Sequence, residues 1–285
     1  MKLNLSRFCM TSQLSILALV LLFPMYSCSE EDSVSDNEDA QSEQLIYDEA
    51  LADDLFQDMD DISMEAATYS ENARVNNSSL FSLACLSRTV ANDNKSLSQL
   101  VTLTFDEGCV DSQGRVRSGK IIINRSINVQ AASYTVSTTF EDFYVNDYQL
   151  VGTRIIVFST NAAQKITATI TLENGKIILP DGSVITRNAT YTKQIDREAG
   201  EISLTGSAEG VNRKGVSYIS TISTPLIYQS ECALEGIFMA SAGKKTITRP
   251  GKRTLELDYG DGICDRTITL IADGIDRTIE VTFSE

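Results

Sequence analysis

From about Leu80 to the end of the chain, apolar residues recur at every second position, and this alternation restricts the possible folds more than any other feature. In one run, Ile166, Ala168, Ile170 and Leu172 alternate with threonines. A period of two is typical of strands that bury one face and expose the other. The pattern predicts roughly twelve strands with short connections. Because a parallel sheet needs long crossovers, we expect an antiparallel sheet.

Turn sequences separate several of these runs. The sequences at 173–176 ("ENGK"), 180–182 ("PDG") and 272–276 ("ADGID") each predict a turn, the first and the last of them hairpins. Asn212 and Gly215 predict another hairpin loop, with the two basic residues between them solvated at its tip. Successive short hairpins favour an all-β fold built as a large antiparallel meander, curved or barrel-like. A β-sandwich is the alternative.

The acidic charge of the chain is concentrated ahead of the β region. The formal net charge of the 285 residues is −15, yet residues 29–72 contain 16 Asp or Glu and no Lys or Arg. The rest of the chain is close to neutral. Binding to nucleic acid requires a basic face. The charge distribution therefore gives no indication of a nucleic-acid partner.

Residues 45–79 are predicted to form an amphipathic helix and a connector. Leu51, Leu55, Met59 and Ile62 recur at helical spacing and form one apolar stripe. Asp and Glu fill the other face. We expect the stripe to pack on the β domain.

The first 28 residues have the parts of an export signal. Lys2 and Arg7 give a basic start, and the apolar stretch at 14–23 is followed by small or polar residues that lead to Cys28. A membrane span needs ~20 apolar residues, so this stretch is too short for a stable one. Its length and the acidic flank both stand against the alternative of an N-terminal anchor that stays in place.

The segment around Cys28 resembles the lipobox of bacterial lipoproteins, in the looser pattern of Bacteroidota. Residues 25–27 ("MYS") precede the cysteine. The resemblance implies a signal peptide at 1–27, cleavage before Cys28 and a diacylglycerol on its thiol. Residues 29–32 ("SEED") resemble the signal that sends such lipoproteins to the cell surface. We therefore expect a protein that is lipid-anchored in the outer membrane and exposed on the cell surface.

The segment 28–44 is predicted to be an acidic flexible tether. It lacks aromatic residues, and its few apolar side chains bury too little surface to offset the entropy of ordering. With the helix and connector at 45–79, the remaining chain forms one β domain at 80–285.

Four cysteines follow the tether: Cys85, Cys109, Cys232 and Cys264. An even number in an exported chain predicts two disulfides, and three pairings are open. The stretches "TLTFDEGCVD" and "TLELDYGDGICD" share a strand, an acidic glycine turn and a Cys–Asp ending. This likeness favours the pairs Cys85–Cys109 and Cys232–Cys264. Zinc binding is a weak alternative role for these cysteines, because the sequence contains no CxxC spacing and no His.

Catalytic chemistry is restricted by the absence of His and Trp from the sequence. Systems based on Ser–His–Asp, Cys–His and HExxH are excluded. Acid–base catalysis would fall to carboxylates, Tyr or Lys. Asp258, Asp261 and Asp265 offer oxygen ligands for calcium, but their spacing differs from an EF-hand and the glycines between them favour a turn. We predict no catalytic residue, metal or cofactor, and no enzyme.

Longer stretches of the chain also carry a resemblance. In order, they are "TFDEGCVDSQGRVRSGKIII", "PDGSVITRNATYT", "GVNRKGVSYISTISTPL" and "RTLELDYGDGICDRTITL". Together they resemble a group of uncharacterised β-rich Bacteroidota lipoproteins, over most of the chain from about Thr102. The resemblance implies a lipoprotein with an all-β body and brings no catalytic residues.

A binding or structural role is the expected function. The partners would be the membrane, through lipid on Cys28, and a glycan or protein ligand. A carboxylate-based hydrolase of surface polymers and a carrier of an apolar ligand are the alternatives.

Overall fold

The computed structural model describes residues 31–68, 83–93, 97–111, 114–160, 166–196, 198–235, 237, 239–272 and 275–280. The predicted signal peptide, Cys28, residues 69–79 of the predicted connector and residues 80–82 of the predicted β domain lie outside these ranges. The chain divides into two compact units, residues 1–39 and 40–285. The arrangement below is that of the second unit.

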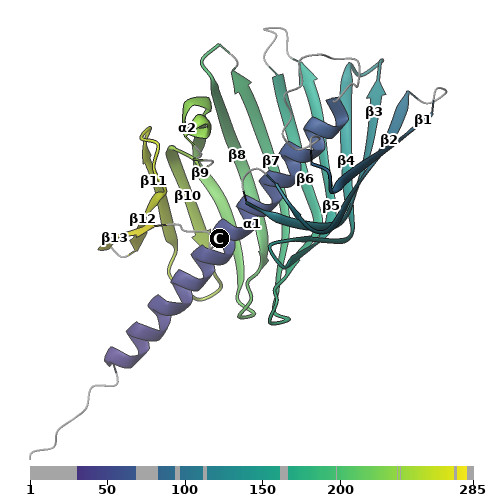
Figure 1. The fold of residues 1–285 in the computed structure, drawn as a ribbon. Coiled ribbons are helices and arrows are strands. Elements are labelled where there is room, and N and C mark those ends of the chain that lie inside the picture. Colours follow the sequence, from purple (N-terminus) through teal and green to yellow (C-terminus); the bar gives the residue numbers. More distant parts are fainter. Residues whose placement is uncertain are drawn as a thin grey trace, which may run out of the picture. The chain divides into compact units, whose positions relative to one another are not determined.

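Within the described ranges, thirteen strands form one antiparallel sheet in which each strand pairs with the next along the chain (Figure 1). The strands are β1 (Leu86–Asp93), β2 (Ser98–Val110), β3 (Val116–Asn128), β4 (Ser133–Val145), β5 (Tyr148–Thr160), β6 (Ile166–Ile178), β7 (Val184–Asp196), β8 (Glu201–Val211), β9 (Ser217–Gln229), β10 (Ala242–Thr248), β11 (Leu255–Asp261), β12 (Thr267–Ala272) and β13 (Ile275–Glu280). The predicted meander is confirmed, and the sheet is not closed.

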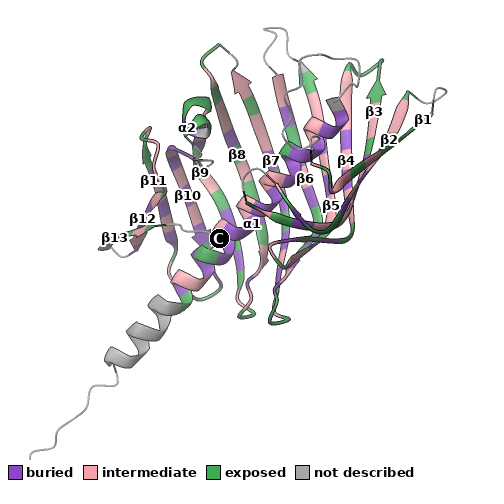
Figure 2. Ribbon diagram, in the orientation of Figure 1, coloured by how far each residue is buried: buried purple, intermediate pink, exposed green. Residues whose placement is uncertain are grey.

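Residues that alternate between apolar and polar in the sequence alternate between buried and exposed in the structure. In β6, Ala168, Ile170 and Leu172 are buried, while Thr169 is exposed. The buried apolar residues of β2 to β7 form one core with those of α1, and α1 crosses the concave face of the sheet (Figure 2). The convex face carries mainly Thr and Ser. The prediction of one packed and one wet face is therefore confirmed.

The turn predictions have mixed outcomes. The turn at 180–182 connects β6 to β7, where Gly182 N donates to Leu179 O at 2.9 Å. The loop of Asn212 and Gly215 connects β8 to β9, and Ala272 pairs with Ile275 in the last hairpin. The hairpin predicted at 173–176 is wrong. Those residues lie inside β6, where the pairing register shifts between Leu172 and Gly175. A bulge uses the same Asn–Gly sequence because Asn174 has a φ of 54°.

Bulges recur near the middle of most strands and bend the sheet. Register shifts occur beside Gly119 in β3, Gly152 in β5 and Gly243 in β10. Each bulge adds a residue to one strand and increases the local bend and twist. At Gly119, which has a φ of +88°, a Cβ would lie 1.9 Å from the carbonyl oxygen of Asp142. Only glycine permits this approach of two backbones.

The helix α1 (Glu31–Thr68) fills the concave face from residue 40 onward (Figures 1 and 2). The predicted stripe of Leu51, Leu55, Met59 and Ile62 is buried, as expected. Other side chains of the helix are buried too, namely Leu45, Ile46, Ala52, Phe56, Ala66 and Ala67. Taken together with the stripe and at 100° per residue, these buried side chains cover more than half of the helix circumference. The sheet therefore contacts α1 on its flanks as well as beneath it.

The helix begins earlier than predicted. Because α1 starts at Glu31, residues 31–44 of the predicted tether are helical in the structure. Acidic residues near a helix N-terminus interact favourably with the helix dipole, and Glu, Gln and Ala are good helix formers. Ser42 is already buried, three residues before the predicted helix start at 45.

Two disulfides secure the ends of the sheet. Cys85–Cys109 ties the residue before β1 to β2, and Cys232–Cys264 ties the short helix α2 (Ser230–Leu234) to the loop after β11. Both pairings are those favoured by the sequence.

The structure predicts different costs for two glycine substitutions. Gly119 and Gly182 have similar φ values, +88° and +81°, but a Cβ at Gly182 would meet nothing within 4 Å. We expect Gly182→Ala to lower the free energy of unfolding by about 1 kcal/mol, from backbone strain alone. Gly119→Ala should cost about 3 kcal/mol or more, since its Cβ collides with backbone. Urea titration of both variants measures the difference. Equal losses would show that the close approach of β3 and β4 is unimportant.

Candidate functional site

The concave face of the sheet carries cations among its apolar side chains. Arg117 (β3), Arg154 (β5), Arg187 (β7) and Lys245 (β10) are all buried. Each lies in phase with the inward apolar residues of its strand. Arg187, for example, lies two residues after Ile185, which is also buried.

The acids of α1 face these cations. The helix contains 14 Asp or Glu and no Lys or Arg. Asp48, Glu49 and Asp60 are among its most buried residues, at 0%, 1% and 3% exposure. We call the resulting set of ion pairs the interior charge network. It consists of Asp48, Glu49, Asp53, Asp54, Asp58 and Asp60 of α1 with Asp111, Arg115, Arg117, Arg154, Arg187, Arg213 and Lys245 of the β domain.

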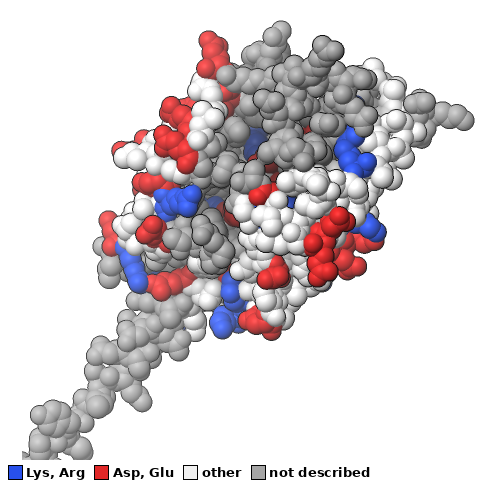
Figure 3. Space-filling model, viewed as in Figure 1, with Lys and Arg blue, Asp and Glu red and all other residues white. Residues whose placement is uncertain are grey.

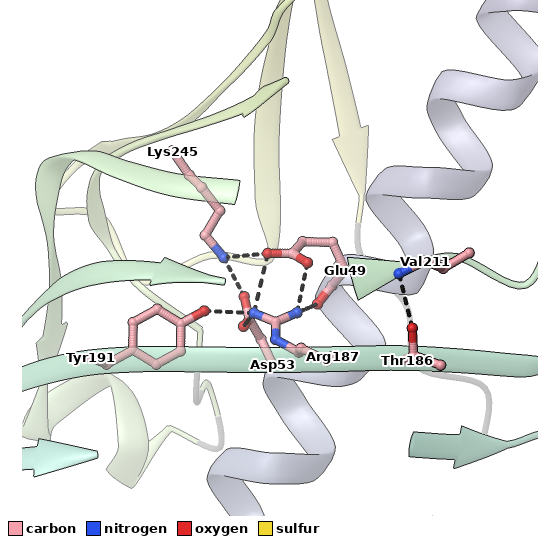
Figure 4. Close-up of polar contacts among 7 residues, drawn as sticks. All are labelled: Glu49, Asp53, Thr186, Arg187, Tyr191, Val211 and Lys245. Carbon is pink, nitrogen blue, oxygen red and sulfur yellow. Dashed lines mark hydrogen bonds and ion pairs between the residues drawn. The ribbon is translucent and has the colours of Figure 1, made fainter. Parts of the chain in front are cut away.

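The centre of the network joins α1 to β7 and β10 (Figure 4). Arg187 donates from Nη1 to Glu49 Oε2 and from Nη2 to Asp53 Oδ1, both at 2.6 Å. Arg187 Nη2 also donates to the Tyr191 hydroxyl at 2.6 Å. Lys245 Nζ lies 3.3 Å from Glu49 Oε1 and contacts Asp53. Two carboxylates one helical turn apart are thus held by two cations from separate strands.

Burial and charge act in opposite directions on these groups. Burial alone would raise the pKa of Glu49, but Arg187 and Lys245 outweigh it and hold that pKa at about 2. Burial alone would lower the pKa of Lys245, and Asp53 with its neighbours raises it well above the usual value. Burial raises the pKa of Tyr259 to about 12, despite the nearby Lys245. Glu49 and Lys245 therefore remain ionised at neutral pH, and Tyr259 remains protonated.

On the same side of α1, two to three turns further on, a second pair is also buried. Arg154 donates from Nε to Asp60 Oδ1 at 2.6 Å and from Nη2 to Oδ2 at 2.7 Å. This two-point geometry is the strongest arrangement for a guanidinium and a carboxylate. Next to it, Thr138 Oγ1 of β4 donates to Ser63 Oγ at 2.9 Å. The contacts fix both the depth and the rotation of the helix.

The opposite flank of α1 is held by β3 and the residues before it. Arg117 Nη1 lies 2.7 Å from Asp58, and its Nη2 lies 2.7 Å from Asp111. Arg115 contacts Asp54 at 3.0 Å. Cations therefore line both sides of the helix, with the apolar core between them.

Arginines also engage the two ends of the docked segment. Arg213 lies 2.6 Å from Asp48, so the prediction that this loop tip is solvated is wrong for Arg213. Near the helix C-terminus, Arg88 donates to Ala66 O at 3.4 Å, and Arg125 donates to Ala67 O. The last carbonyls of a helix lack partners within it and carry partial negative charge, so arginine stabilises them.

A small cavity remains beneath the helix. It measures about 30 Å³, and its lining includes Phe56, Asp60, Arg154, Tyr191 and Tyr228. That space holds about one water molecule and excludes an organic ligand while α1 is docked. The basic side chains visible in Figure 3 are scattered among acidic and neutral ones.

The network specifies how α1 is placed. Buried ion pairs contribute little net stability over apolar contacts, but removing one partner is costly because the other charge is left buried. The concave face therefore accepts a helix only if acids lie at matching positions. The expectation that acids occupy only the face away from the packed stripe is corrected here, because several of them contact the sheet on the flanks of that stripe.

The sequence contained a signal for the network that our predictions missed. Arg117, Arg154, Arg187 and Lys245 occupy inward positions of their strands, where a cation needs a buried partner. Only α1 supplies enough acids without bases. The pairings themselves depend on strand register, which the misplaced hairpin at 173–176 would have shifted.

The predicted site residues have separate outcomes. Cys28 lies outside the described residues, and the four other cysteines form the two disulfides. Asp258 contacts Lys244 at 3.1 Å, and Asp265 accepts hydrogen bonds from Thr267 at 2.9 Å. Within the described ranges, no group of three or more Asp, Glu or Cys side chains is placed to hold a metal ion.

The comparisons with known proteins add no relative. The chain matches no protein-family model, and searches of curated proteins and of solved structures returned no match. In the part of the chain that the structure describes, no helix has the length and hydropathy to cross a membrane.

The low pKa of Glu49 predicts a pH-dependent contribution to stability. The pKa is about 2 in the folded protein, against a usual value of 4.5. The contribution of Glu49 is therefore complete above pH ~4.5 and is lost as the pH falls toward 2, a change of about 3 kcal/mol. Glu49→Gln should cost about 3 to 5 kcal/mol at pH 7, because buried cations lose a partner. The cost should shrink by about 2 kcal/mol at pH 3 and by about 3 kcal/mol at pH 2.

Urea titration at these pH values measures this difference. Glu141→Gln is the control, because Glu141 and its partner Lys120 are 53% and 41% exposed. Its cost should stay below about 1 kcal/mol at each pH. A cost for Glu49→Gln that does not change with pH would contradict the assignment.

Proposed function

We propose that this protein is a lipoprotein anchored in the outer membrane through Cys28, exposed on the cell surface, with a binding or structural role. The observation that carries the non-catalytic part is the state of the interior. The concave face is occupied by the chain's own helix, and the acids and bases that meet there neutralise one another. Acid–base catalysis needs such groups to reach a substrate.

The alternatives receive less support from the same geometry. A carboxylate-based hydrolase needs two convergent acids beside a space for a sugar. The convergent acids Glu49 and Asp53 are bound to Arg187 and Lys245, and the neighbouring cavity measures about 30 Å³. A carrier of an apolar ligand would have to release α1 first, since the helix fills the concave face.

Export is supported by the two disulfides, which form and persist in oxidising compartments. The anchor rests on the resemblance of the segment around Cys28 to a lipobox. In the sequence, two residues separate Cys28 from Glu31, the first residue of α1.

The convex face is the surface that we propose for ligand binding. Neighbouring strands place hydroxyls side by side in one row: Thr171, Thr190, Ser207, Thr221 and Thr246, from β6 to β10. Adjacent strands are ~4.8 Å apart, and each hydroxyl can donate and accept a hydrogen bond. A regular row of this kind suits a polyhydroxylated ligand such as a glycan.

The anchor is tested by Cys28→Ala in the full-length chain. We expect loss of fatty-acid labelling and release of the protein from the membrane fraction, because the thiol is the site of lipid attachment. Cys9→Ala, which changes a cysteine inside the predicted signal peptide, is the control and should keep both. Labelling that persists in Cys28→Ala would contradict the proposed site.

The binding role is tested with glycan arrays and with hydrolysis assays on the same polysaccharides. We expect binding without turnover. The double variant Thr190→Lys, Ser207→Lys should abolish binding, since the long charged side chains cover the hydroxyl row. Glu141→Gln, which lies away from this row, should bind as the wild type does. Measurable hydrolysis, or binding that survives the double variant, would contradict this part of the proposal.

A further inference from the structure

The concave face has the properties of a binding groove for one kind of helix. Its floor is apolar, and its cations contact acids on both flanks, such as Arg187 with Glu49 and Arg117 with Asp58. At one end, Arg88 and Arg125 bind backbone carbonyls at a helix C-terminus. Binding of an amphipathic helix in an apolar groove is a common mode of recognition. Here the charges add a requirement for acids.

Within the described ranges, the sheet that forms the groove is not closed, and part of α1 faces away from it, where Tyr47 is 38% exposed and Asp61 is exposed. Apart from Arg117–Asp111, the ion pairs of the network join α1 to strands or to the loops beside them. The helix can therefore leave the groove sideways without breaking the pairing of any strands.

The vacated groove would have to be filled again. Buried cations such as Arg187 and Lys245 are costly without anionic partners. Among the described segments, α1 is the one helix long enough to span the groove, and it contains no base. The helix that matches a vacated groove best is thus the α1 of another copy of the chain.

We propose that the groove also binds α1 in trans, so that two copies assemble by exchanging this helix. Each groove in the pair keeps the contacts described above, with acids supplied by the other chain. Exchange of identical elements is a low-cost route to a dimer, because it creates no new interface. The inference goes beyond the proposed function and does not depend on the lipid anchor.

Disulfide trapping tests the exchange. Ser63 of α1 and Thr138 of β4 are buried and lie 2.9 Å apart at their hydroxyls. Two full-length copies with tags of different size are co-expressed, one with Ser63→Cys and the other with Thr138→Cys. Two cysteines at these positions lie close enough to join. We expect a mixed dimer on a non-reducing gel, which requires α1 of one copy in the groove of the other.

Two controls accompany the disulfide-trapping experiment with native charges. A single chain with both substitutions should form an internal disulfide, which shows that the cysteine pair is competent. Thr169→Cys replaces Thr138→Cys in the second control. Because Thr169 is exposed on the convex face, it should give no mixed dimer with Ser63→Cys.

A second arm uses charge to favour exchange. Asp60→Arg is added to the copy with Ser63→Cys, and Arg154→Asp to the copy with Thr138→Cys. Within each copy, like charges then meet, whereas both exchanged pairs are matched. We expect roughly tenfold more mixed dimer than with native charges. Absence of mixed dimer in both arms, while the single-chain control forms its disulfide, would overturn the proposal.

Discussion

The pairing of acids on α1 with inward cations of the sheet is the interaction on which the rest of the structure depends. An open, curved sheet has an apolar concave face that must be covered. Here the cover is a single helix, and Arg154 with Asp60 and Arg187 with Glu49 set its position. An apolar helix of similar size would leave these arginines buried without partners. The charges therefore determine which helix can cover the sheet more than they add to the stability of the fold.

The bulges give the sheet the curvature that its contact with the helix requires. Without them, a sheet of long strands would be twisted but too flat to contact the flanks of a helix. At Gly119 and Gly243, the partner backbone lies where a Cβ would be, so the bends depend on glycine. Curvature brings Arg117 on one flank of α1 and Arg187 on the other within reach of the same helix. The shape of the sheet and the charge of the helix are therefore complementary.

The candidate site could be predicted only in part. The apolar stripe of α1 and both disulfide pairings followed from residue spacing and from local likeness between two segments. The pairing of the acids of α1 with buried cations did not follow from these features. A charge on an amphipathic helix is usually solvated, and only the position of Arg187 or Lys245 on an inward strand face indicates otherwise. Which acid pairs with which cation depends on the strand register. The bulge after Leu172 shows that a sequence typical of a hairpin can lie inside a strand, so that the register is predicted wrongly.

By itself, the sequence determined that the chain forms an antiparallel all-β fold with one packed face, because it has a period of two and short connections; it favoured a meander and left a β-sandwich open. It also determined that the acidic segment contains an amphipathic helix. The tertiary structure decided where that helix lies and what its acids do. The reason is that burial of a charge depends on partners such as Asp60 and Arg154, which are far apart in the chain. Only the curvature of the finished sheet brings them together.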